Sequence, residues 1–135
     1  MSITAYFEQL EAPLTNPRWS WGAVRASDGA VVLRVWQDHR IVQDRTPIMM
    51  LTHHSKYQGR EDNLGYQERL EHVWLVREGA TCYMVMCLAV DPEASPRKIQ
   101  SYNSTDVFVG GELLELDGDT WITLVDRLPW QEVAK

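Results

Sequence analysis

The stretch from Arg18 to Asp38 holds the side chains that could bind a flat polar ligand. They are three of the chain's six tryptophans with one arginine and one aspartate: Trp19, Trp21, Arg34, Trp36 and Asp38. Indole rings offer broad stacking surfaces, and a guanidinium group packs favourably against their faces. A carboxylate beside such rings can also accept hydrogen bonds from the edge of a ligand. We therefore expect these five residues to bind a planar group, such as a nucleobase or a modified base.

A β-hairpin must bring these residues together. Asp28-Gly29 lies between two runs of alternating apolar residues, which is typical of a two-residue turn because both turn positions need a positive φ. Such a turn places Trp21 opposite Trp36 and Trp19 opposite Asp38, all on one face. The other face is mainly aliphatic and is expected to pack in the core. A three-residue loop would shift the pairing by one residue and break this sorting.

A polar segment supplies one further aromatic side chain. Residues 53–62, HHSKYQGRED, contain a glycine and no aliphatic residue, so we expect a loop. Within it, Ser55–Arg60 combines Tyr57 with basic side chains. A loop of this composition can lie over a neighbouring groove or contact phosphate groups. Tyr57 therefore joins the expected ligand-binding residues.

Two other interpretations of the tryptophan face stay open. Trp21 and Trp36 could close the core beneath an N-terminal helix, with Arg34 reaching the surface and paired to Asp38. Alternatively, an exposed tryptophan and methionine surface could be the interface of a homodimer or a larger complex, because aromatic residues and arginine are enriched there. A binding cavity predicts a concave site in each monomer, whereas an interface predicts a flat patch buried against a second copy.

Other chemistry has weaker support in the sequence. The four histidines show neither HxH nor HExxH spacing, and no G-x-S-x-G or Gly-rich phosphate pattern is present. Both cysteines, Cys82 and Cys87, lie in the most apolar run, where thiols are usually inert. We expect no metal, no cofactor and no catalytic residue. An enzyme is favoured only if Asp38, a histidine and a tryptophan share one cleft.

Composition sets the outer bounds. At 135 residues the chain fits a single domain, 1–135, large enough to bury a core without disulfides or metals. A net charge of −6 argues against nonspecific binding to a phosphate backbone, although a local basic patch is compatible with it. No segment is apolar over the roughly 20 residues that a membrane span needs. The first ten residues do not resemble a signal peptide, so we expect a cytoplasmic protein without membrane partners.

Two helices are indicated by capping signals. Ser2 or Thr4 can cap a short N-terminal helix. Asn63 can cap a main helix over about 63–78, and Gly79 supplies its stop. The apolar residues of the main helix recur at helical spacing and are expected to face the core: Tyr66, Leu70, Val73 and Trp74. Its polar residues are expected to face solvent or a neighbour: Gln67, Glu68, Arg69, Glu71 and His72.

The remaining elements are strands. Thr81–Val90 is apolar on both faces, which is typical of a central strand. Cys82 and Cys87 would point to opposite faces there and could not form a disulfide. A second hairpin turns at Asp117-Gly118-Asp119. With six to eight strands, the expected fold class is α+β, a curved and mostly antiparallel sheet or a small β-barrel.

The order of these elements resembles a known superfamily. An aromatic-rich opening hairpin, a helix leading into a buried strand and a closing β-hairpin look like the small barrels of the PUA-like superfamily, with the EVE and ASCH branches most similar. The segment NPRWSWG at Asn16–Gly22 occupies a comparable place. Members of that superfamily bind RNA or extruded, often modified, bases in an aromatic-lined pocket. The resemblance implies the same kind of ligand here.

Overall fold

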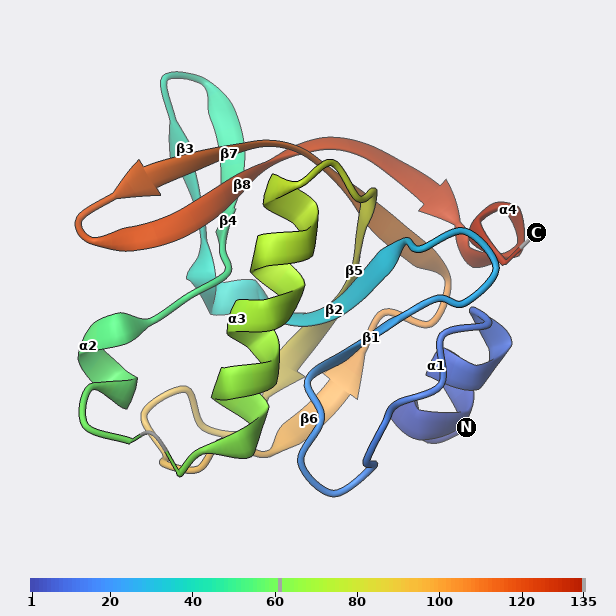
Figure 1. The fold of residues 1–135 in the computed structure, drawn as a ribbon, viewed down its shortest axis with the longest axis horizontal. Coiled ribbons are helices and arrows are strands. Elements are labelled where there is room, and N and C mark those ends of the chain that lie inside the picture. The colour runs from blue at the N-terminus through green and yellow to red at the C-terminus, as the bar shows by residue number, and fades with distance from the viewer. Residues whose placement is uncertain (61, 135) are drawn as a thin grey trace.

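A curved sheet forms the body of the protein in the computed structural model (Figure 1), which describes residues 1–60 and 62–134. Within these residues the sheet has eight strands: β1 (Gly22–Val24), β2 (Val31–Trp36), β3 (Arg40–Gln43), β4 (Thr46–Met50), β5 (Cys82–Ala89), β6 (Ile99–Tyr102), β7 (Asp106–Leu116) and β8 (Asp119–Pro129). The helices are α1 (Ile3–Gln9), α2 (His54–Tyr57), α3 (Leu64–Arg77) and α4 (Trp130–Val133), with a short 3₁₀ helix at Gln37–His39. None of them is long and apolar enough to cross a membrane.

The strands follow the order β1-β2-β5-β7-β8-β4-β3, and β6 pairs with β5. Only β2 and β5 run parallel, because α3 and the β3–β4 hairpin lie between them in the chain. Every other pairing is antiparallel. The α+β class and the curved, mostly antiparallel sheet are therefore confirmed. The sheet stays open between β1 and β3, so it does not close into the barrel that we considered as the alternative.

Two hydrophobic clusters cover the two faces of the sheet. Alternation along β2 separates them, since Val31, Leu33 and Val35 join one cluster and Val32 joins the other. The first cluster includes buried residues of α3, and the second includes α1. Cys82 and Cys87 are free, buried and divided between the clusters, as the strand period predicts.

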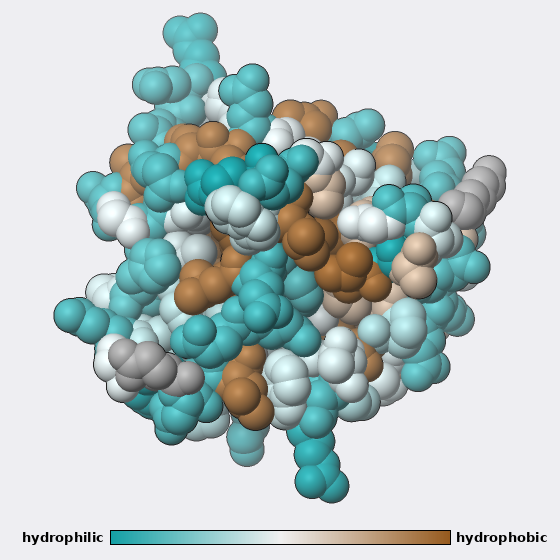
Figure 2. Space-filling view, viewed as in Figure 1, coloured by the Kyte–Doolittle hydropathy of each residue, from teal (hydrophilic) through white to brown (hydrophobic). Residues whose placement is uncertain are grey.

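The main helix begins and ends where its capping residues predict. The Asn63 side chain accepts a hydrogen bond from the Tyr66 N–H, and Gly79 follows the helix with a φ of 112°. Its predicted buried face is partly wrong, because Trp74 is 59% exposed whereas Arg69 and His72 are buried. Figure 2 shows the outward face of this region, where hydrophobic patches alternate with hydrophilic residues.

The opening hairpin has a longer loop than we predicted. Its strands pair Gly22 with Leu33 and Ala23 with Val32, so Trp21 lies opposite Arg34, whose N–H donates to the Trp21 carbonyl at 2.8 Å. The predicted pairing of Trp21 with Trp36 is therefore wrong by two residues, and that of Trp19 with Asp38 is wrong because Trp19 lies in the turn before β1. A shift of two keeps the residues of β1 and β2 on their predicted faces. Trp21 precedes β1, and its ring lies against Gly65 of α3.

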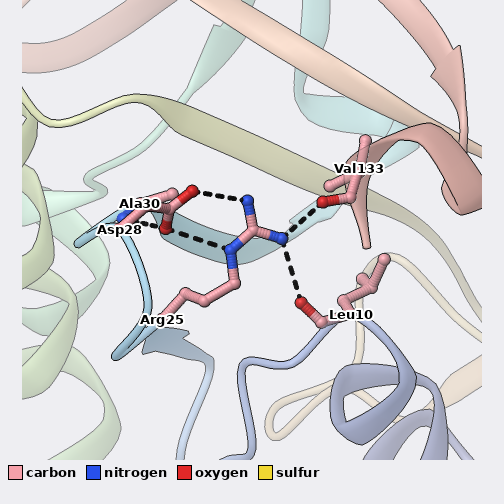
Figure 3. Close-up of polar contacts among 5 residues, drawn as sticks. All are labelled: Leu10, Arg25, Asp28, Ala30 and Val133. Atoms are coloured by element: carbon pink, nitrogen blue, oxygen red, sulfur yellow. Dashed lines mark hydrogen bonds and ion pairs between the residues drawn. The ribbon is translucent and has the colours of Figure 1, made fainter. Parts of the chain in front are cut away.

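A buried arginine explains the longer loop. Arg25 donates to both carboxylate oxygens of Asp28, and Asp28 also accepts from the Ala30 N–H (Figure 3). These contacts span a four-residue connection, residues 26–29. Arg25 also donates to the carbonyls of Leu10 at 3.1 Å and Val133 at 2.5 Å. Through these two bonds, the hairpin is linked to the segment that follows α1 and to α4.

The polar segment 53–62 is also more ordered than predicted. It contains the single helical turn α2, and its residue Glu61 lies outside the described residues. The His54 N–H that begins this turn donates to Asp119 at 2.7 Å, and Thr52 donates to the same carboxylate at 3.0 Å. Asp119 therefore holds α2 to the start of β8.

Candidate functional site

A cavity of about 410 Å³ lies where α2, the start of α3 and the end of β2 meet the segment that joins β5 to β6. This volume is within the range of small-molecule sites. Four aromatic side chains line it: Trp21, Trp36, Tyr57 and Tyr66. Five basic side chains line it as well: Arg34, Lys56, Arg60, Arg69 and Arg97. None of the lining residues in the described part of the chain is acidic.

Three aromatic rings form one wall of the cavity. Tyr57 of α2 stacks on Tyr66 of α3, with ring centroids 4.4 Å apart and 18° between the planes. The centroid of the Trp21 ring lies 5.4 Å from that of Tyr57 and 6.2 Å from that of Tyr66. The Tyr66 hydroxyl accepts from the His53 N–H and hydrogen-bonds His54 Nδ1 at 2.7 Å. These contacts fix the ring of Tyr66, and with it the wall.

A second wall combines Trp36 with Arg97. The guanidinium carbon of Arg97 lies over the Trp36 ring, 5.2 Å from its centroid. Both terminal nitrogens of Arg97 donate to the Asp38 carboxylate, at 2.7 and 2.8 Å. This bidentate pair lowers the pKa of Asp38 from its ordinary value. Asp38 therefore acts on the cavity through Arg97.

Arg69 connects the backbone segments on the buried side of the cavity. It is 6% exposed and donates to the carbonyls of Leu51 at 3.1 Å, Trp21 at 3.4 Å and Arg34. These carbonyls come from the β1–β2 side of the sheet and from the end of β4, which are not neighbours in the strand order. Its Nε is buried without a hydrogen-bond partner among the described residues. Arg69 thus joins two walls and adds a positive charge behind them.

Four of the basic groups have no carboxylate partner in the part of the chain that the structure describes. Among the described residues, no carboxylate lies within 4.0 Å of the charged nitrogens of Arg34, Lys56, Arg60 or Arg69. Burial lowers the pKa of Arg34 and that of Lys56. Burial, and then the nearby Arg34, lower the pKa of Arg69 to about 10. Burial therefore destabilises the charged forms of these groups, and a bound anion would stabilise them.

The predicted ligand-binding residues divide into two groups. Trp21, Arg34, Trp36 and Tyr57 line the cavity together. Trp19 and Asp38 do not line it. Trp19 belongs to the turn before β1, and its carbonyl lies against Gly65 of α3.

The basic lining residues were only partly apparent in the sequence. The segment Ser55–Arg60 already indicated Lys56 and Arg60, because it combines basic residues with Tyr57. Arg69 was assigned to the outer face of its helix, although it lies three residues after Tyr66 and four before Val73. That spacing is the signal that would have placed it on the buried face.

Catalytic groups are sparse around the cavity. His39 and His53 line it with ring centroids 5.6 Å apart, and burial lowers the pKa of His39 to about 4. Burial raises the pKa of Cys82 to about 12 and that of Cys87 to about 11, which opposes thiolate formation. In residues 1–60 and 62–134, no three histidine, cysteine or acidic side chains gather as metal ligands.

Comparisons with protein-family models, curated proteins and solved structures find no match to this chain.

Proposed function

We propose that the protein is a small binding module that holds a planar ligand, such as a nucleobase, in the aromatic and basic cavity. The observation that carries this proposal is the convergence of four aromatic rings and five basic side chains on one space of about 410 Å³. Base–aromatic stacking contributes about 1–3 kcal/mol per base and tolerates different bases, because every base has a π-face. Guanidinium groups beside the rings can donate to acceptor atoms on the edge of such a ligand. The resemblance to PUA-like barrels adds the prediction that the base belongs to RNA or is a modified base.

The test is a calorimetric titration with nucleosides and nucleotides, run on the wild type and on Trp36→Ala. We expect Trp36→Ala to weaken binding by about 1–3 kcal/mol, because it removes a stacking surface and the platform beneath Arg97. Trp36→Phe keeps an aromatic face and should recover part of the affinity. Trp74→Ala is the matched control, since Trp74 is 59% exposed and does not line the cavity.

One result would oppose the assignment of the ligand to this cavity, and another would require a second variant. Binding that Trp36→Ala leaves unchanged would place the ligand elsewhere. Unfolding of Trp36→Ala, judged by circular dichroism, would indicate that Trp36 is needed for the core, and Trp21→Phe would then be titrated in its place.

An interface function is the second candidate, and the outer face of α3 favours it. Leu64, Trp74 and Leu75 are 55%, 59% and 37% exposed on this helix. Aromatic residues are enriched in interfaces between subunits. Light scattering of the wild type and of Trp74→Arg tests this function. A dimer that becomes a monomer on substitution would support it, and a monomeric wild type would oppose it.

A further inference from the structure

We propose that the ligand of the cavity is a free nucleoside monophosphate, whose base meets the aromatic walls and whose phosphate meets Arg34 and Lys56. This inference rests on the proposed function and adds the charge and the size of the ligand. It departs from the RNA strand that the PUA-like resemblance implies, because it makes a polynucleotide the weaker ligand. Two features of the molecule carry it: positive charge inside the cavity that has no carboxylate partner among the described residues, and net negative charge elsewhere in the chain.

The positive charge inside the cavity is larger than a neutral base requires. A neutral base would leave four basic groups without a carboxylate partner among the described residues: Arg34, Lys56, Arg60 and Arg69. Buried charges without partners are costly, and an ionised phosphate offers oxygen acceptors that match guanidinium and ammonium donors. A phosphate monoester carries about −1.5 to −2 charges near pH 7. The cavity therefore fits a ligand that carries a compact group of this charge.

The basic groups are arranged from the interior to the rim. Arg69 is almost fully buried, and its terminal nitrogens are already bonded to backbone carbonyls. Arg34 and Lys56 are half-buried in the wall, whereas Arg60 is exposed. Arg97 is held by Asp38. Arg34 and Lys56 are consequently the groups best placed to contact the phosphate, with Arg69 raising the positive potential behind them.

Charge outside the cavity argues for a small ligand. The chain has 13 basic and 19 acidic residues, and five of the basic ones line the cavity. Outside the cavity lining, the chain therefore has eight basic and 19 acidic residues, so its remaining charge is net negative. The other phosphates of a strand would meet a protein whose remaining charge is net negative, which disfavours their binding. A free nucleotide keeps its phosphate within the basic region.

Calorimetric titration in phosphate-free buffer tests the inference. The probes are the four common nucleoside 5′-monophosphates, their nucleosides, and a single-stranded oligonucleotide without terminal phosphates. We expect at least one monophosphate to bind about tenfold or more tightly than its nucleoside, which is the size of one charge-assisted hydrogen bond. We also expect the oligonucleotide to bind more weakly than that monophosphate.

Different failures have different meanings. Equal affinity for a nucleoside and its monophosphate would overturn this inference and leave the proposed function standing. Tighter binding of the oligonucleotide would do the same. If no nucleoside and no nucleotide binds, the proposed function fails together with the inference.

Arg34→Gln separates a binding role from a structural one. It should weaken monophosphate binding about tenfold or more and change nucleoside binding little, because the lost charge faced the phosphate. Its melting temperature should equal or exceed that of the wild type, since the variant removes a desolvated charge that has no described carboxylate partner. Arg40→Gln is the matched control, because Arg40 is exposed on β3 and does not line the cavity.

If Arg34→Gln destabilises the fold strongly, Lys56→Gln repeats the test from α2. An unchanged ratio of monophosphate to nucleoside affinity in a folded variant at both positions would overturn the assignment of the phosphate site.

Discussion

Arg25 shows how one residue can stabilise contacts between distant parts of the chain. Its guanidinium is fully buried and bonds the Asp28 carboxylate and the carbonyls of Leu10 and Val133 (Figure 3). The Asp28 pKa falls to about 2, first because of the hydrogen bond from Arg25. A buried charge is tolerated only where hydrogen bonds satisfy it in this way. No local sequence pattern predicts this packing role, because Leu10 and Val133 are distant from Arg25 in the chain.

We expect Arg25→Met to lower the free energy of unfolding by roughly 3 kcal/mol. The substitution leaves the Leu10 and Val133 carbonyls without their donor in a buried place, at about 1–3 kcal/mol for each unsatisfied group. Asp28→Asn should cost only about 1 kcal/mol, because the Asp28 side chain is half-exposed and solvent screens its charge. Urea denaturation measures both values. A larger loss for Asp28→Asn than for Arg25→Met would contradict this account.

At the scale of elements, α3 is fitted closely against the turn that precedes β1. A Cβ atom at Gly65 would lie 2.5 Å from two ring atoms of Trp21 and 2.7 Å from the Trp19 carbonyl. A glycine therefore stands inside the first turn of the helix, although alanine has the better helix propensity by about 1 kcal/mol. The close approach positions Trp21 in the cavity wall.

We expect Gly65→Ala to weaken ligand binding and to destabilise the protein by about 1–3 kcal/mol. The added methyl group overpacks the contact and displaces the Trp21 ring. Gln67→Ala, at an exposed position of the same helix, should leave both quantities close to the wild-type values. Thermal unfolding and nucleotide titration of the two variants provide the comparison. A gain in stability for Gly65→Ala would show that helix propensity outweighs the contact.

Elements defined by local signals were predictable from the sequence. Asn63 and Gly79 delimit α3 within one residue, because capping depends on neighbours in the chain. The faces of the residues within β1 and β2 were also predictable, since they depend only on the two-residue period of a strand. The loop length was not predictable, because it depends on Arg25, whose partners at Leu10 and Val133 are distant in the sequence.

The cavity was predictable only in part, for a similar reason. Trp21, Arg34 and Trp36 are close in sequence, so their types and spacing predicted a shared site. Trp21 reaches it from the turn before β1, where its ring lies against Gly65 of α3, and Trp36 also packs against the cluster that includes α1. Arg69 and Arg97 reach the same cavity from α3 and from the segment after β5, and no local pattern links them to the hairpin. The segregation of basic residues into one cavity of an acidic chain is a property of the tertiary structure.

At the scale of the whole molecule, the cavity is assembled from segments that are not neighbours in the sheet. Arg69 bonds the carbonyls of Trp21 and Arg34 on the β1–β2 side. It also bonds the carbonyl of Leu51, which follows β4. Side chains of α2 and α3 supply much of the cavity wall beside these carbonyls. The position of the cavity therefore depends on how helices and strands pack together, and no single element contains it.

The stability of the whole molecule should depend on pH through two histidines, His72, which is buried, and His39, which is half-buried. Burial lowers the pKa of His72 to about 4, with the Arg69 charge as the second cause, and burial lowers the pKa of His39 to about 4 as well. The ordinary value for both is 6.5. Above pH 6.5 neither the folded nor the unfolded chain protonates them appreciably. Between pH 6.5 and 4 the unfolded chain binds protons that the folded chain does not, so the free energy of unfolding falls as the solution is acidified.

For His72 this difference in pKa corresponds to a loss of about 3 kcal/mol between pH 6.5 and 4, at about 1.4 kcal/mol for each pH unit. His72→Leu should remove its share of the pH dependence without leaving a partner unsatisfied, because the buried His72 Nδ1 has no hydrogen-bond partner in the described residues. Urea denaturation of the wild type and of His72→Leu at several pH values across this window measures the two slopes. Identical slopes would mean that His72 is protonated as readily in the folded chain as in the unfolded one, which is incompatible with its burial against Arg69.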